Sequence, residues 1–181
     1  MDVRVCAAED LARLRAQWPT PGSDVHGAHV AAQQRGSASY LVAWRGPMPL
    51  GSAMVNWDGC VGANARSTYP GCVEIHHLQV RSEQRGRGVG AELITVAEEL
   101  IRSRGHTRAC LGVAAENPGA ARLYRRLGYR PTGVRDLTAY TWIDEDGVAH
   151  DEIEDDELLV KCLDAQRPAG LSAWRAALPD P

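Results

Sequence analysis

The order of apolar and polar residues along the chain alternates between two spacings. Short apolar or alternating runs predict strands, whereas apolar residues three and four positions apart predict helices. The strand pattern covers residues 3–7, 40–44, 50–57, 72–80, 108–114, 139–143 and 157–163, with a further strand that begins at Tyr129. The helical pattern covers residues 9–18, 25–34, the segment after Gly90, and 117–128. Residues 58–71 are polar and glycine-rich and predict a loop, and the whole order favours an α+β or α/β domain on a mixed sheet.

The helix after Gly90 is the best-defined element of this pattern. Its apolar residues form a single stripe along one face, at Leu93, Ile94, Ala97, Leu100 and Ile101. Gly105 is a suitable stop for this helix. The later helix is signalled at both ends, because Asn117 can cap its start and Gly128 suits its end.

Length and composition bound the class of protein. The 181 residues suffice for one domain with a core, which we place at residues 1–164, followed by a peripheral tail at 165–181. The net charge of −3 gives no sign of a nucleic-acid partner, and no apolar run reaches the roughly 20 residues that span a membrane. The first residues lack a signal-peptide pattern, so a cytoplasmic protein is expected.

The cysteines and histidines predict no metal site. Five cysteines are an odd number, and no two lie close in the sequence, so neither a disulfide framework nor a zinc site is indicated. We expect all five to be structural. His76 and His77 give no metal site either, because neighbours on a strand face opposite sides of the sheet.

Residues 85–91 read Arg-Gly-Arg-Gly-Val-Gly-Ala and lie between a predicted strand and a helix. Glycines let an anion approach the unpaired first amides of a helix, and arginines add charge that suits phosphate. A P-loop is excluded because Gly90-Ala91-Glu92 stands where Gly-Lys-Ser/Thr is needed. The glycine spacing also fits a dinucleotide-binding loop, but the next strand ends without the acidic residue expected about 20 positions on. A glycine-bearing turn without a ligand is the remaining alternative.

A second motif follows one helix and one strand later. Residues 117–129 begin with Asn and continue as a short helix that ends in Leu-Tyr-Arg-Arg-Leu-Gly-Tyr. Together with the glycine loop, this order resembles the GNAT superfamily of acetyl-CoA-dependent N-acyltransferases, over about residues 73–129. The resemblance implies an α+β fold in α/β/α layers, with a mixed, mostly antiparallel sheet of about six to seven strands flanked by about four helices.

The resemblance also implies roles for individual residues. The backbone of Leu78, Gln79 and Val80 would pair with the pantetheine arm of coenzyme A, and the Leu78 amide would polarise the thioester carbonyl. Asn117 would contact the cofactor arm, and Tyr124 would protonate the departing thiolate. The pyrophosphate would be held by amides of Arg85, Gly86, Arg87, Gly88, Val89, Gly90 and Ala91.

Acid and base candidates also follow from the chemistry of the residues. A thiolate leaving group benefits from a donor such as the Tyr124 hydroxyl, although a core aromatic fits the same helix spacing. A protonated amine must lose a proton before it attacks a thioester, and a carboxylate can take that proton. Glu74 interrupts an apolar strand and is the candidate base. The alternative is that Glu74 points outward from the strand or forms a structural ion pair. His76 shares the strand face of Glu74 and is an alternative base or proton relay.

Residues 144–157 contain nine acidic side chains in fourteen positions and no lysine or arginine. A solvated hairpin loop explains this composition. The alternative is a wall that attracts a cationic acceptor, such as a polyamine, an aminoglycoside-like amine or a basic peptide. The loop at 58–71, with Trp57 and Tyr69, is a second candidate acceptor wall.

These observations predict an N-acetyltransferase that uses acetyl-CoA as co-substrate and needs no metal. The acceptor is the primary amine of a small molecule, cationic or neutral, or of a peptide, and it attacks directly without a cysteine intermediate. Two alternatives remain: a coenzyme A-binding sensor or regulatory module without turnover, and an acyltransferase for a longer acyl-CoA. Neither a nucleic acid nor a membrane is an expected partner, and a homodimer is compatible with the prediction.

Overall fold

The computed structural model describes residues 1–20, 22–143 and 149–163. Its strands form one seven-stranded sheet in the order β1-β2-β3-β4-β5-β7-β6, in which only the β4–β5 pair is parallel. The strands are β1 (Asp2–Val5), β2 (Ala38–Arg45), β3 (Met48–Asn56), β4 (Val73–Val80), β5 (Arg108–Ala114), β6 (Arg130–Ile143) and β7 (Ala149–Cys162). The helices are α1 (Asp10–Gln17), α2 (Val25–Gln34), α3 (Ala63–Thr68), α4 (Val89–Ser103) and α5 (Pro118–Arg126), with a 3-10 turn η1 (Ser82–Gln84).

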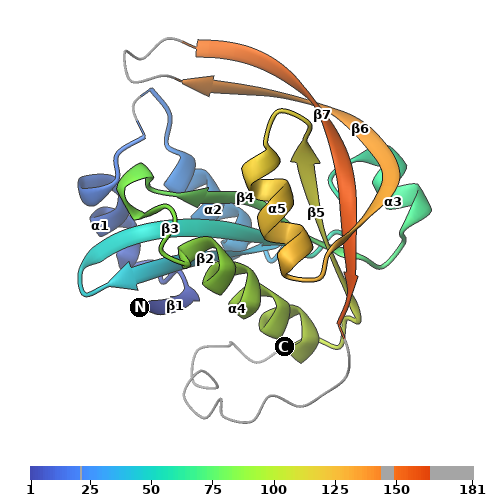
Figure 1. The fold of residues 1–181 in the computed structure, drawn as a ribbon. Coiled ribbons are helices and arrows are strands. Elements are labelled where there is room, and N and C mark those ends of the chain that lie inside the picture. The colour runs from blue at the N-terminus through green and yellow to red at the C-terminus, as the bar shows by residue number, and fades with distance from the viewer. Residues whose placement is uncertain (21, 144–148, 164–181) are drawn as a thin grey trace.

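Helices cover both faces of the sheet, as the alternation of side chains along β2 requires. Leu41 and Ala43 belong to the core under α4, whereas Tyr40 and Val42 belong to a second core with residues of α1 and α2. Figure 1 shows α4 and α5 on the near face of the sheet and α1 and α2 behind it. The layered, mixed, mostly antiparallel sheet expected from the sequence is therefore confirmed.

The strongest helical patterns in the sequence are confirmed as well. The apolar stripe of α4 is buried in the main core. At the start of α5, the Asn117 side chain accepts a hydrogen bond from the Ala120 amide at 3.0 Å, and Gly128 follows its end with a φ of 93°. No helix in the described part of the chain is both long enough and apolar enough to cross a membrane.

Three predictions about the less periodic segments were wrong. The predicted loop at 58–71 contains α3, and the separate strands predicted near Tyr129 and at 139–143 are one strand, β6. Most of the acidic segment is not a loop either, because residues 149–157 belong to β7 and pair with β6. Residues 144–148 and the predicted tail at 165–181 lie outside the described residues.

A long-range contact explains why α3 forms in a polar, glycine-rich segment. The Asp136 carboxylate, on β6, accepts hydrogen bonds from the amides of Asn64 and Ala65, both at 2.9 Å. It therefore satisfies the first amides of α3, as a local cap residue would in an ordinary helix. Because the cap comes from 71 to 72 positions away in the chain, local sequence gives no start signal.

Candidate active site

A cavity of about 400 Å³ opens where β4 and β5 diverge. The two strands pair only at Val73 with Ala109 and at Glu74 with Cys110, so beyond Glu74 they separate and leave a wedge. Strand β4, the end of β5, the start of α5, the β3–α3 connection and the β6–β7 pair supply its walls. The predicted site residues that line this cavity are Glu74, Leu78, Gln79, Asn117 and Tyr124.

A bulge in β4 shapes the floor of this wedge. Ser52 pairs with Gln79 and Met54 pairs with His76, so His77 and Leu78 together lie opposite the single residue between them on β3. His77 has a φ of 48°, in the left-handed region that few non-glycine residues adopt. Bulges of this kind leave a residue outside the ladder and are common next to active sites. Leu78 is thus placed where its backbone can face a ligand.

The bulge also brings adjacent histidines together, which corrects the prediction that they face opposite sides. The rings of His76 and His77 lie 4.8 Å apart, and His29 from α2 lies 5.1 Å from His77. His76 and His77 both line the cavity. Burial lowers the pKa of His76 to about 3, with smaller effects from the other two histidines, so its ring is neutral at pH 7.

Glu74 is a buried carboxyl group at the narrow end of the wedge. The residue is 7% exposed, and Oε2 accepts a hydrogen bond from the Val61 amide at 2.6 Å. Burial raises the pKa of Glu74 to about 7, against the lowering effect of the Val61 amide. A carboxyl group in that range can accept a proton near neutral pH and release it again.

Tyr124 lies on α5 and lines the same cavity. It is 6% exposed and packs with the main core, while its side chain also lines the cavity. Burial, with a smaller contribution from Asp156, raises the pKa of Tyr124 to about 12. Its hydroxyl therefore stays protonated at neutral pH and is available as a donor. The ring is therefore part of the core, as one interpretation of the helix spacing expected, and the residue also borders the cavity.

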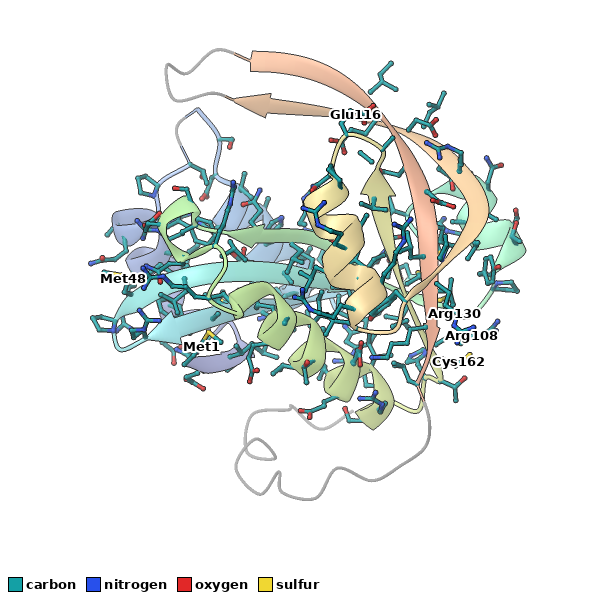
Figure 2. The ribbon with its side chains drawn as sticks, viewed as in Figure 1. Met1, Met48, Arg108, Glu116, Arg130 and Cys162 are labelled. Atoms are coloured by element: carbon teal, nitrogen blue, oxygen red, sulfur yellow. The ribbon has the colours of Figure 1, made fainter. Side chains whose placement is uncertain are left out.

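Asn117 occupies the junction between β5 and α5. Its Oδ1 caps the helix, and the residue lines the cavity at the same time. Figure 2 shows the neighbouring Glu116 on the loop between these elements. The cap orients the Asn117 side chain and uses one of the two lone pairs of Oδ1, so the second lone pair and the amide nitrogen remain for a ligand.

The glycine loop lies beyond the far end of β4 and does not line the cavity. Gly86 and Gly88 have φ values of 73° and 84°, and an added Cβ at either would meet nothing within 4 Å. Gly88 immediately precedes α4, whose first amides have no partners within the helix. Arg85 and Arg87 are exposed beside it. The space beside both glycines is therefore open, at the start of a helix whose first amides suit an anion.

Strand β4 connects the two candidate regions. Glu74 lines the cavity, and the chain after Val80 continues through η1 into the glycine loop. The six steps between them cover about 20 Å at roughly 3.3 Å per residue. A ligand that occupies both regions must therefore be long, with an anionic group at one end.

The β6–β7 pair contributes acidic residues to the cavity wall, some from the acidic segment noted in the sequence and one from outside it. Glu154 and Asp156, two positions apart on β7, both line it, together with Asp136 of β6. Their neighbour Asp155 instead forms an ion pair with Arg135 at 2.8 Å. Asp136 was missed in the sequence, because only the pairing of β6 with β7 brings it to the wedge.

The 58–71 segment, the second candidate acceptor wall, contributes only some of its residues to the cavity lining. Val61, Gly62 and Ala65 from the 58–71 segment line the cavity. Trp57 does not, since its ring packs against the Arg104 guanidinium, 3.9 Å from the ring centre. Tyr69 packs against a buried cluster that contains Cys60, away from the cavity lining.

Comparison with known proteins identifies the family. A family model described as the acetyltransferase (GNAT) family matches residues 7–129. This match covers more than half of the chain, so the protein belongs to the GNAT acetyltransferase family. The match ends at Tyr129, the last residue of the second motif.

Individual relatives are similar over limited regions of sequence. An uncharacterized N-acetyltransferase of Methanocaldococcus jannaschii is 45% identical over 56 residues, which are 31% of this chain and 25% of that protein. The chain spans only 25% to 35% of the length of the first curated relatives it matches.

Solved structures agree over nearly the whole chain. A putative acetyltransferase from Salmonella typhimurium, with its cofactor acetyl-CoA, has a TM-score of 0.61 and 19% identity, over 94% of this chain and 98% of its own. A phosphinothricin acetyltransferase from Sinorhizobium meliloti, in complex with acetyl-CoA, has a TM-score of 0.62 and 20% identity, over 98% of this chain and 97% of its own. At these identities the agreement establishes the GNAT fold.

Proposed function

We propose that this protein is an N-acetyltransferase that passes the acetyl group of acetyl-CoA directly to an amine. The observation that carries the proposal is that Glu74 of β4 and Tyr124 of α5 line one cavity. Strand β4 continues from that cavity to a glycine loop at a helix start, as a long anionic co-substrate requires. Both solved relatives described above hold acetyl-CoA, which supports this choice of co-substrate.

The chain offers a binding group for each part of coenzyme A. The backbone of Leu78, Gln79 and Val80, at and after the bulge, would pair with the pantetheine arm like an added strand. The amides of residues 85–91 would hold the pyrophosphate, with Arg85 and Arg87 as flanking charges. The Leu78 amide would donate to the thioester oxygen as negative charge develops on it.

The proposed reaction balances its protons between two side chains. Glu74 takes a proton from the ammonium group of the acceptor, and the resulting amine attacks the thioester carbon. The carbon–sulfur bond then breaks as the Tyr124 hydroxyl gives its proton to the leaving sulfur. The attacking nitrogen is positively charged after attack and must lose a second proton to become the amide, and this proton returns to the Tyr124 oxygen. Glu74 releases its own proton to solvent. No cysteine takes part in this sequence.

A thiol-release assay with acetyl-CoA against a panel of amines, aminoglycosides and peptides tests the proposal. We expect release of coenzyme A that depends on the acceptor, with an acetylated amine as the second product. Tight coenzyme A binding without release for any acceptor would instead support a sensor module. Faster release from longer acyl-CoA molecules would support the second alternative.

Replacement of Gly88 tests the pyrophosphate site. Gly88→Glu should weaken coenzyme A binding at least about 100-fold, because a carboxylate at the helix start repels the phosphates and displaces two or more charge-assisted hydrogen bonds, worth about 1.5–3 kcal/mol each. Gly105→Glu is the matched control, since Gly105 also has a positive φ, 83°, and open space, but lies at the other end of α4. Calorimetric affinity unchanged in Gly88→Glu would contradict the assignment.

We further propose that the acceptor is cationic beyond its reacting amine. Glu154 and Asp156 share one face of β7 and line the cavity. The double variant Glu154→Gln/Asp156→Asn should raise the KM of a polyamine by roughly 10-fold and flatten its salt dependence. Asp155→Asn, on the opposite strand face and paired with Arg135, should leave that KM unchanged. An equal effect of both variants, or none, would argue for a structural role of the acidic residues.

A further inference from the structure

Three buried cysteines from separate segments lie close together next to Glu74, where β4 and β5 are still paired. Cys60 follows β3, Cys72 immediately precedes β4 and Cys110 lies on β5, yet their Sγ atoms all lie within 4.8 Å of one another. The Cys60 and Cys110 sulfurs are 3.4 Å apart. None of the three residues is more than 1% exposed. Their wide separation in the sequence explains why cysteine spacing gave no signal.

The separations suit a metal ion bound by three sulfurs. A metal–sulfur bond of about 2.3 Å places the sulfurs of a planar trigonal site about 4.0 Å apart. The observed separations, from 3.4 Å to at most 4.8 Å, bracket that value. An ion at the centre of the triangle could therefore be reached by side-chain adjustments of a few tenths of an ångström.

The surroundings favour three ligands rather than four. Among the residues that the structure describes, no fourth cysteine, histidine or carboxylate joins the group. The cluster is closed instead by the apolar side chains of Ala65 and Leu158, with Tyr69, Val134 and Val160 packed around it. Structural zinc sites are almost always four-coordinate, and catalytic ones keep an open position for water. Within the described part of the chain, this packed cluster offers neither a fourth ligand nor an open position for water, so it does not suit zinc. Soft thiolate ligands also select copper(I), which three sulfurs can bind.

Two arginines lie beside the ligand-bearing backbone. The Arg66 side chain donates a hydrogen bond to the Cys60 carbonyl at 2.9 Å, and Arg108 donates to the carbonyl of Pro70, two residues before Cys72, at 3.1 Å. Three thiolates around one monovalent ion carry a net charge of −2. The two guanidinium groups supply the opposite charge that a buried anionic complex requires.

We propose that Cys60, Cys72 and Cys110 form a trigonal binding site for a soft monovalent metal ion, copper(I). Binding forms three copper–sulfur bonds, releases the three thiol protons to solvent and leaves the oxidation state of copper unchanged. The site is distinct from the catalytic groups but next to them. The amide of Val61, the residue after Cys60, donates a hydrogen bond to the Glu74 carboxylate, and Cys110 is the partner of Glu74 in the β4–β5 pair.

Anaerobic titration of the full chain with copper(I), against bicinchoninate as competitor, tests this site. We expect one copper per chain to be retained after desalting, and X-ray absorption to report three sulfur ligands at about 2.3 Å. Single substitutions Cys60→Ser, Cys72→Ser and Cys110→Ser should each lower retained copper at least about 10-fold. Cys6→Ser and Cys162→Ser are the controls, one buried in a different core cluster and one exposed, and should retain it.

Several outcomes would overturn the site. They are no copper retained by the reduced wild-type chain, two sulfur ligands instead of three, equal loss in the two control variants, or preferential retention of zinc at one per chain. The wild-type coordination number is decisive even where a serine variant fails to fold, and circular dichroism identifies such a variant. Because no readout depends on turnover, failure of this site would leave the proposed acetyltransfer untouched.

Discussion

Glu74→Gln should lower kcat of amine acetylation by about 10²–10⁴-fold and leave coenzyme A affinity nearly unchanged. Glutamine keeps the shape of the side chain and can still accept the hydrogen bond that Val61 donates to Glu74. It cannot take a proton from an ammonium group, so only the base function is removed. Single-turnover rates with a saturating acceptor, together with calorimetric affinity for coenzyme A, separate the chemical step from binding.

His76→Asn is the matched control for this prediction. His76 is two residues away on the same strand and lines the same cavity, but burial keeps its ring neutral with a pKa of about 3. A large rate loss in His76→Asn, with a small one in Glu74→Gln, would transfer the role of base to the histidine. Equal small losses in both would indicate that water takes the proton without a side chain.

The parts of the fold that local sequence could predict are those whose periodicity is strong. The stripe of α4 is buried, α5 is capped as expected, and the apolar runs of β2 to β5 form buried strands of the sheet. Asn117 and Tyr124, both from the second motif, line one cavity together with Glu74. In these elements local pattern and tertiary packing agree, which is the condition for reading structure from sequence.

The parts that could not be predicted depend on contacts between distant residues. Helix α3 takes its cap from Asp136, and the acidic segment becomes a strand because it pairs with β6. The bulge that turns His77 toward His76 arises from the register of β4 against β3. The cysteine cluster joins residues up to 50 positions apart. Each feature depends on contacts between residues far apart in the chain, which the local spacing of residues does not reveal.

Two contacts between distant segments position Glu74. Its ladder partner is Cys110, and its carboxylate is held by the amide that follows Cys60. The carboxyl group that the sequence singles out as a base is therefore positioned by segments that carry no sequence motif. The motifs suggest the chemistry proposed for this site, whereas the 58–72 segment, which carries no motif, helps to position the Glu74 carboxylate.

Tyr124→Phe should lower kcat by about 10²–10⁴-fold while the KM for acetyl-CoA changes little. The ring packs in the main core and is retained by phenylalanine, so the variant loses only the hydroxyl that would protonate the leaving sulfur. Tyr129→Phe is the matched control, because that ring lies 6.4 Å from Tyr124 but does not line the cavity. Comparable losses in both variants would indicate a packing effect rather than an acid.

The pH dependence of the wild-type rate gives a second test of Tyr124. A neutral acid is fully active below its pKa and loses its proton as the pH rises through it, so activity that depends on Tyr124 should persist to about pH 12. A tyrosine with the ordinary pKa of about 10 would already lose half of that contribution at pH 10. We therefore expect kcat to remain level between pH 8 and about pH 10.5, measured in short assays that precede unfolding and corrected for thioester hydrolysis. A decline centred near pH 10 that is absent in Tyr124→Phe would show that the hydroxyl titrates as an exposed phenol. Such a result would contradict the buried position from which its role as acid is argued.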